Sequence, residues 1–112
     1  MKIQEREQDG ITVLEVSGDI DLQSSPKLRE VLQAKVKNKC SALLVVMGQV
    51  GYMDSSGLAT LIEYYQSSRG YQGKLALCSL TPRVKNVFEV ARLDQIFRLF
   101  SGEPEGVEFL KS

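Results

Sequence analysis

The run Asp54-Ser55-Ser56-Gly57 combines residue types that can begin a helix and receive a phosphate. Asp and Ser are preferred at helix N-caps because their side-chain oxygens accept hydrogen bonds from free backbone N–H groups, which contributes about 1 kcal/mol. The same N–H groups, with the positive end of the helix dipole, favour a phosphate group. Phosphorylation of a serine there adds about −1.5 to −2 charges. Because burying an unpaired charge against a partner is costly, the run is a candidate binding switch.

Three sizeable apolar residues, Val50, Tyr52 and Met53, directly precede this polar run. A hydrophobic staple, in which the residue before the N-cap packs onto the helix, accounts for one of them. Exposed apolar surface usually marks contact with another molecule. We therefore expect part of this loop to face a partner protein.

Two further groups of residues suggest other chemistry. Asp19 and Asp21 project to the same face of an extended segment, and with Asp54 they suggest an acidic Mg²⁺ site like that of a response-regulator receiver domain. That alternative predicts a parallel sheet from the first strand onward. Ser24-Ser25-Pro26-Lys27 matches the S-x-x-K motif of Ser-Lys hydrolases, but the companion motifs S-D-N and K-T-G are absent. A helix cap followed by a solvated lysine accounts for this run without catalysis.

The composition excludes several classes of protein. The 112 residues contain no histidine, which removes Ser-His-Asp and Cys-His hydrolases and most zinc sites. No G-x-x-x-x-G-K loop is present for nucleotide hydrolysis. Cys40 and Cys78 lack C-x-x-C spacing and are expected to be reduced thiols. We expect neither a metal nor a cofactor.

The charge balance and hydropathy bear on partners and location. Fourteen Lys and Arg balance fourteen Asp and Glu, which argues against nucleic acid as the main partner. The longest apolar run, Ala42–Met47, is far shorter than the roughly 20 residues that cross a bilayer, so no direct membrane insertion is expected. Without the apolar segment of a signal peptide near Met1, the chain is expected to be cytoplasmic.

The order of elements predicts an α/β fold. Asp9-Gly10 is a strong hairpin signal, Ala42–Met47 is typical of a strand buried on both faces, and Pro26 and Pro82 follow helix N-cap residues. Right-handed crossovers then place about four helices against a small mixed sheet in a single domain, residues 1–112. The expected strands span residues 1–7, 11–17, 42–47 and 74–78, with an edge strand within 95–100. The expected helices span residues 24–38, then Asp54 to Gly70, and a third begins at Thr81; a terminal helix starts within 107–110. In the third helix, the side chains expected to face inward are Val84, Val87, Phe88 and Ala91.

Four segments, in this order, resemble the STAS domain (sulfate transporter and anti-sigma factor antagonist), especially the stand-alone bacterial anti-sigma factor antagonists. They are Gly18-Asp19-Ile20-Asp21, Ala42–Met47, Met53-Asp54-Ser55-Ser56-Gly57-Leu58 and Pro82–Phe88. The resemblance covers about residues 8–100, and the stretch around Asp54 is its most specific part. It implies a STAS-type mixed sheet that begins with a hairpin and continues with parallel strands.

The resemblance also implies a function. Members of that family bind an anti-sigma factor that is also a GHKL-type serine kinase, which inactivates them by phosphorylating the first serine of the motif, here Ser55. A PP2C-type phosphatase reverses the modification, and the unphosphorylated domain captures the kinase and frees the sigma factor. The domain itself is not an enzyme. The expected partner-binding residues are the acid after the second strand and residues around the motif: Asp21, Tyr52, Met53, Asp54, Ser56 and Gly57.

Some positions depart from the family pattern. Met47-Gly48 replaces the more usual Leu-Asn or Leu-Asp, Ala59 replaces a common Gly, and Asp19 stands where Glu is frequent. The phosphoacceptor is retained, but the choice of partner is left open. STAS domains also occur as subunits of lipid ABC transporters or as other constitutive protein-binding modules, where this serine need not be phosphorylated.

Overall fold

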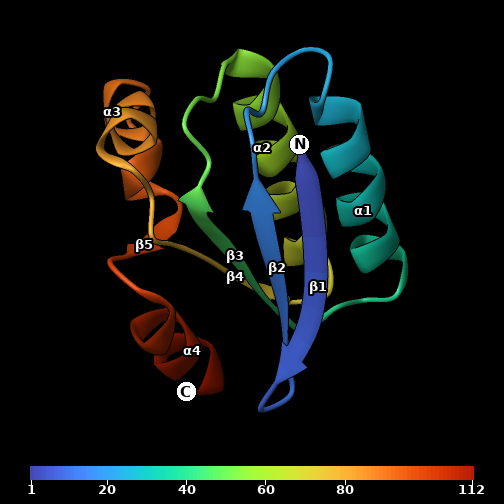
Figure 1. Ribbon diagram of the computed structural model, residues 1–112. Coiled ribbons are helices and arrows are strands. Elements are labelled where there is room, and N and C mark those ends of the chain that lie inside the picture. The colour runs from blue at the N-terminus through green and yellow to red at the C-terminus, as the bar shows by residue number, and fades with distance from the viewer.

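The computed structural model describes all residues, 1–112, and contains one five-stranded sheet with the strands in sequence order (Figure 1). β1 and β2 are antiparallel, and β2, β3, β4 and β5 are mutually parallel. The predicted mixed sheet is therefore confirmed, and the receiver-domain alternative, which needs a parallel first pair, is wrong. The strands are β1 (Lys2–Gln8), β2 (Ile11–Ser17), β3 (Ala42–Gln49), β4 (Lys74–Cys78) and β5 (Arg98–Phe100).

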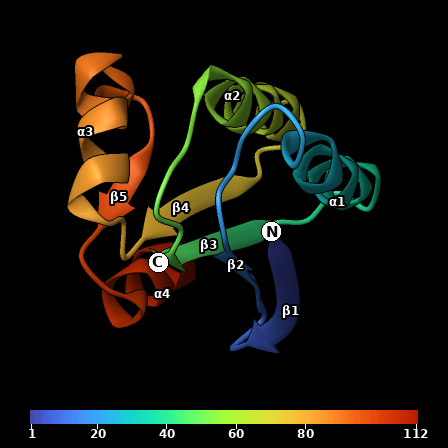
Figure 2. The same cartoon turned by 45° about the horizontal axis from the view of Figure 1, so that its top comes forward.

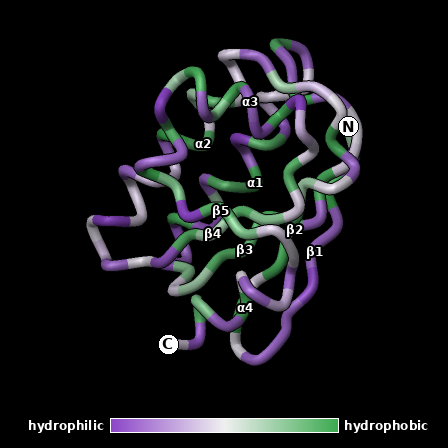
Figure 3. The backbone as a smooth tube through the Cα atoms, turned by 90° about the vertical axis from the view of Figure 1, so that its left-hand side faces the viewer, coloured by the Kyte–Doolittle hydropathy of each residue, from purple (hydrophilic) through white to green (hydrophobic).

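The helices lie on both faces of this sheet (Figures 1 and 2). The first three pack on one face, where a core of 17 buried residues includes Leu28, Leu61 and Phe88. The last helix packs on the other face over a smaller cluster that includes Val107 and Leu110. Figure 3 shows hydrophobic segments running along the sheet through the centre of the molecule. The helices are α1 (Ser25–Lys37), α2 (Ser55–Arg69), α3 (Pro82–Val90) and α4 (Glu103–Lys111).

Most local predictions hold because they depend on a few neighbouring residues. Asp9 and Gly10 both have positive φ, 54° and 80°, as a tight two-residue hairpin requires. Leu43 and Leu44 point to opposite faces of β3 and are both fully buried. The Thr81 hydroxyl accepts a hydrogen bond from the Val84 N–H at 3.4 Å, which confirms it as the N-cap of α3.

Three predictions near the C-terminus differ from the structure. Ala91 is exposed because α3 ends before it, and Arg92 adopts a left-handed conformation (φ 60°) that leads into the short 3-10 helix η1 (Leu93–Gln95). That helix leaves only Arg98–Phe100 for the edge strand. The terminal helix begins at Glu103, earlier than predicted, with a proline in its first turn.

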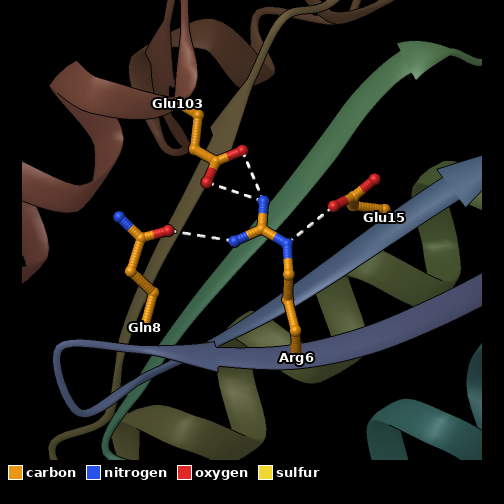
Figure 4. Close-up of polar contacts among 4 residues, drawn as sticks. All are labelled: Arg6, Gln8, Glu15 and Glu103. Atoms are coloured by element: carbon orange, nitrogen blue, oxygen red, sulfur yellow. Dashed lines mark hydrogen bonds and ion pairs between the residues drawn. The ribbon is translucent and has the colours of Figure 1, made fainter.

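Arg6 connects the two ends of the chain. Its guanidinium donates to Glu15 on β2 at 2.7 Å and to both carboxylate oxygens of Glu103 at 2.6 Å (Figure 4). A further bond reaches Gln8 at 2.9 Å. These contacts fasten the start of α4 to the hairpin.

None of the helices has the length and hydrophobicity required to span a membrane. Both cysteines are free thiols; Cys78 is buried and Cys40 is partly buried.

Candidate functional site

The candidate site lies where two loops meet beyond the carboxyl ends of β2 and β3. The Ile20 N–H donates to the Tyr52 carbonyl at 2.9 Å, and the Asp54 N–H donates to the Ile20 carbonyl at 3.1 Å. Ile20 and Met53 form a parallel β-bridge. Loops at this end of parallel strands commonly form binding sites in α/β folds. The pairing brings Asp21 next to the start of α2, although the two segments are far apart in sequence.

Asp54 caps α2, as predicted. Its carboxylate accepts hydrogen bonds from the Ser56 hydroxyl at 2.5 Å, the Ser56 N–H at 2.9 Å and the Gly57 N–H at 3.4 Å. These bonds, led by the one from the Ser56 hydroxyl, hold the pKa of Asp54 below its ordinary value. Two of the N–H groups expected to be free for a phosphate, those of Ser56 and Gly57, are therefore already bound to a carboxylate.

The two serines of the motif have different environments. Ser55 is the first residue of α2, its side chain is exposed, and its hydroxyl makes no hydrogen bond within the protein. Ser56 is partly buried and its hydroxyl donates to Asp54. The hydroxyl of Ser55 is thus open to an approaching molecule, whereas that of Ser56 is engaged in the cap.

Asp21 shapes the turn that leads into α1. Its carboxylate accepts from the N–H groups of Gln23 and Ser24, both at 3.0 Å. Ser24 occupies the N-cap position of α1, but its hydroxyl accepts from the Asp21 N–H at 2.9 Å and donates to the Asp19 carbonyl at 2.8 Å. The N-cap predicted within Ser24-Ser25-Pro26 thus falls at Ser24 without a side-chain cap, because this hydroxyl stabilises the preceding turn instead.

The apolar residues of the loop are divided between core and surface. Tyr52 is 38% exposed, and the Arg83 guanidinium carbon lies 5.3 Å from its ring centroid. Val50 and Met53 are 0% and 2% exposed. The expectation that the Met53 side chain contacts a partner is wrong, because it packs beneath α2.

Gly57 makes that packing possible. A Cβ at this position would lie 2.7 Å from Ile20 Cγ2 and 2.8 Å from Met53 Cγ. Gly57 is buried, so its role is to let the helix start approach the loops closely, as expected from its place in the motif. This close approach fixes the position of Asp54 and Ser55 relative to the two loops.

Two residues of this surface, Leu22 and Arg83, lie outside the set expected to bind a partner. Leu22 follows Asp21 directly and is 76% exposed, and its backbone N–H contributes to the lowered pKa of Asp54. Arg83 reaches Tyr52 from the first turn of α3. An apolar residue inside the polar run Asp21–Ser25 was the available signal for Leu22. The position of Arg83 at the start of a helix indicated a surface contact, but its contact with Tyr52 depends on how α3 packs.

The arrangement offers hydroxyl and carboxylate groups but no cation-binding cluster. No three His, Cys, Asp or Glu side chains are placed to hold a metal ion. An open, polar groove of about 560 Å³ begins at Ser56 and runs between α1 and α2. The Arg29–Glu63 ion pair, 3.0 Å long, lies along it. The hydroxyl and carboxylate groups of the site are therefore suited to binding another molecule through hydrogen bonds.

The fold and site define a small mixed α/β domain with an exposed serine at the start of a helix. The chain belongs to the STAS domain family, whose model matches residues 2–106. It is 32% identical to the anti-sigma-B factor antagonist of Listeria monocytogenes, over 94% of this chain and 91% of the relative. It is 29% identical to the anti-sigma-B factor antagonist of Bacillus subtilis, over 83% of this chain and 84% of the relative.

Solved structures confirm the fold. The crystal structure of an anti-sigma factor antagonist from Mycobacterium paratuberculosis superposes with a TM-score of 0.91 at 23% identity, over 99% of this chain and 94% of that one. The Bacillus cell fate determinant SpoIIAA in its phosphorylated form gives a TM-score of 0.76 at 16% identity, over 97% and 99%.

Proposed function

We propose that this chain is an anti-sigma factor antagonist that is switched off by phosphorylation of Ser55. The names of its relatives support an anti-sigma factor as the partner. The proposed partner is an anti-sigma factor that is also a GHKL-type serine kinase, and a PP2C-type phosphatase restores the active form. The domain acts as a single binding unit in the cytoplasm, without catalysis or a cofactor of its own.

The observation that carries this proposal is the contrast between the two serines. The exposed hydroxyl of Ser55 is free of hydrogen bonds, so a kinase can reach it without dismantling the cap. The hydroxyl of Ser56 lies 2.5 Å from Asp54 and must break that bond to react. Phosphorylation at Ser55 therefore leaves the helix start intact and changes the surface alone.

The local charges explain how such a modification weakens binding. The carboxylates of Asp54 and Asp21 are nearby, and the Arg83 guanidinium lies over the Tyr52 ring. Because the N–H groups of Ser56 and Gly57 already bind Asp54, these two groups are not available to bind the phosphate. A partner that buries this surface must desolvate an uncompensated dianion, and each 1.4 kcal/mol of that cost lowers affinity about tenfold.

Intact mass spectrometry tests the proposal. The chain is incubated with ATP and each purified GHKL-type serine kinase of its source genome. One kinase should add a single phosphate, Ser55→Ala should abolish the gain, and Ser56→Ala should retain it. Incubation of the product with a PP2C-type phosphatase should reverse it. Phosphate on Ser56, or the absence of any phosphate, contradicts the proposal.

Binding measurements separate the switch from the constitutive alternative. Ser55→Asp should weaken the complex with the kinase relative to Ser55→Ala, although Asp carries fewer charges than phosphate. Unchanged binding of Ser55→Asp, together with co-purification of membrane transport proteins, would instead indicate a transporter subunit.

A further inference from the structure

Four large apolar side chains are exposed: Leu22 (76%), Tyr52 (38%), Val90 (77%) and Ile96 (47%). Leu22 and Tyr52 belong to the two loops that meet at the candidate site. The loops are joined by the bond from the Ile20 N–H to the Tyr52 carbonyl. The Asp54 N–H donates to the carbonyl of Ile20, two residues before Leu22, at 3.1 Å, and Tyr52 lies two residues before Asp54. Two of the four exposed apolar side chains therefore flank the residue that caps α2.

Tyr52 is held in place before any partner arrives. The Arg83 guanidinium lies over its ring at 5.3 Å, a cation–π distance. The first turn of α3 is fixed to the same loop, because the Thr81 hydroxyl donates to the Val50 carbonyl at 3.1 Å. An aromatic side chain that is already ordered loses little conformational entropy on binding. Such residues are frequent at the energetic centres of protein interfaces.

We propose that Leu22 and Tyr52 are the apolar contacts through which the kinase partner binds the surface around Ser55. The inference rests on the proposed function and specifies the partner's complementary surface as apolar. An interface held by charge would instead require a basic partner surface opposite Asp21 and Asp54. A phosphate on Ser55 would strengthen that interface, which is opposite to an off-switch.

Apolar contacts explain why phosphorylation of Ser55 weakens binding instead of strengthening it. When Leu22 and Tyr52 are covered, water is removed from around Ser55. A neutral hydroxyl tolerates this change, whereas a phosphate loses its hydration and an apolar partner surface supplies no cation in exchange. The same two side chains thus supply affinity in one state and make the other state costly.

The experiment compares matched exposed residues. Leu22→Ser is paired with Val90→Ser, because Leu22 and Val90 are almost equally exposed. Val90 lies at the far end of α3, about 10 Å along the helix axis from Arg83. Calorimetric titration with the kinase that phosphorylates the wild-type chain gives each Kd, and circular dichroism melting verifies folding. Leu22→Ser and Tyr52→Ser should each weaken binding about tenfold or more, whereas Val90→Ser and Ile96→Ser should change it less than about twofold.

The outcomes are separable. If Ser55 is phosphorylated but Leu22→Ser binds as well as Val90→Ser, this inference is wrong and the proposed function stands. Binding that falls steeply between 0.05 and 0.5 M salt, on the order of a hundredfold, would indicate a charged interface and also overturn the inference. A wild-type chain that neither binds nor is phosphorylated by any of the kinases overturns both.

Discussion

Gly57→Ala is the substitution that tests most directly how the site is positioned. The added Cβ would lie 2.7 Å from Ile20 Cγ2 and 2.8 Å from Met53 Cγ, well inside the usual carbon–carbon contact of about 3.5–4.0 Å. Both neighbours are buried, at 0% and 2% exposure, so neither can move into solvent. The substitution therefore forces apart the loops and the start of α2.

The magnitude follows from two opposing contributions. Overpacking of a well-filled core costs about 1–3 kcal/mol, and the better helix propensity of alanine recovers at most about 1 kcal/mol. Two contacts below 3.0 Å with buried side chains place the overpacking cost in the upper part of that range, so we expect a net loss of about 1–2 kcal/mol in the free energy of unfolding. In urea denaturation that loss lowers the midpoint by about 0.5–1 M.

The control is Gly51→Ala in the same loop. A Cβ there meets only Asp19 Oδ1, at 3.9 Å, so the stability should change by less than about 0.5 kcal/mol. If Gly57→Ala proves as stable as the wild type, the close packing of α2 on the two loops is not a constraint and the explanation given for Gly57 fails.

Three further predictions concern single groups. Hydrogen bonds from Ser56 lower the pKa of Asp54, so the ionised carboxylate stabilises the folded protein. This contribution is fully present above the ordinary pKa of Asp and is lost as the pH falls through the lower pKa of the folded state. The free energy of unfolding of Asp54→Asn, measured in urea, should therefore approach that of the wild type in acid. Arg6→Gln should lower the free energy of unfolding by about 1 kcal/mol, a modest amount because Arg6 is partly exposed. It should also speed amide hydrogen exchange in α4 more than in the sheet. An equal increase in both would contradict the anchoring role of Arg6. Burial raises the pKa of Cys78, so a thiol reagent should modify Cys40 first and Cys78 only on unfolding.

The proposed contacts also bear on which residues determine partner choice. Asp21 and Asp54 are engaged in turn and cap hydrogen bonds, so their substitution perturbs the local backbone as well as the surface. Leu22 and Tyr52 make few such contacts and can vary without altering the fold. Exchanging these two side chains between antagonists is therefore the change most suited to altering specificity.

The sequence by itself determined the local elements and the character of the motif. The hairpin follows from the Asp9-Gly10 pair, the buried strand from the apolar run at Ala42–Met47, and the start of α2 from Asp54. Each depends on backbone preferences or side-chain patterns within a few residues. The resemblance carried by the four segments then correctly indicated the STAS fold, because their order and spacing are specific to it.

Only the tertiary structure decided which of these side chains face outward. Met53 is buried and Leu22 is exposed, although both are apolar residues in loops, because one lies beneath α2 and the other has nothing packed over it. The bond from the Ser56 hydroxyl to Asp54 and the contact of Arg83 with Tyr52 were likewise invisible in the sequence. Burial and long-range contact depend on how distant elements pack, and local sequence patterns do not encode that packing.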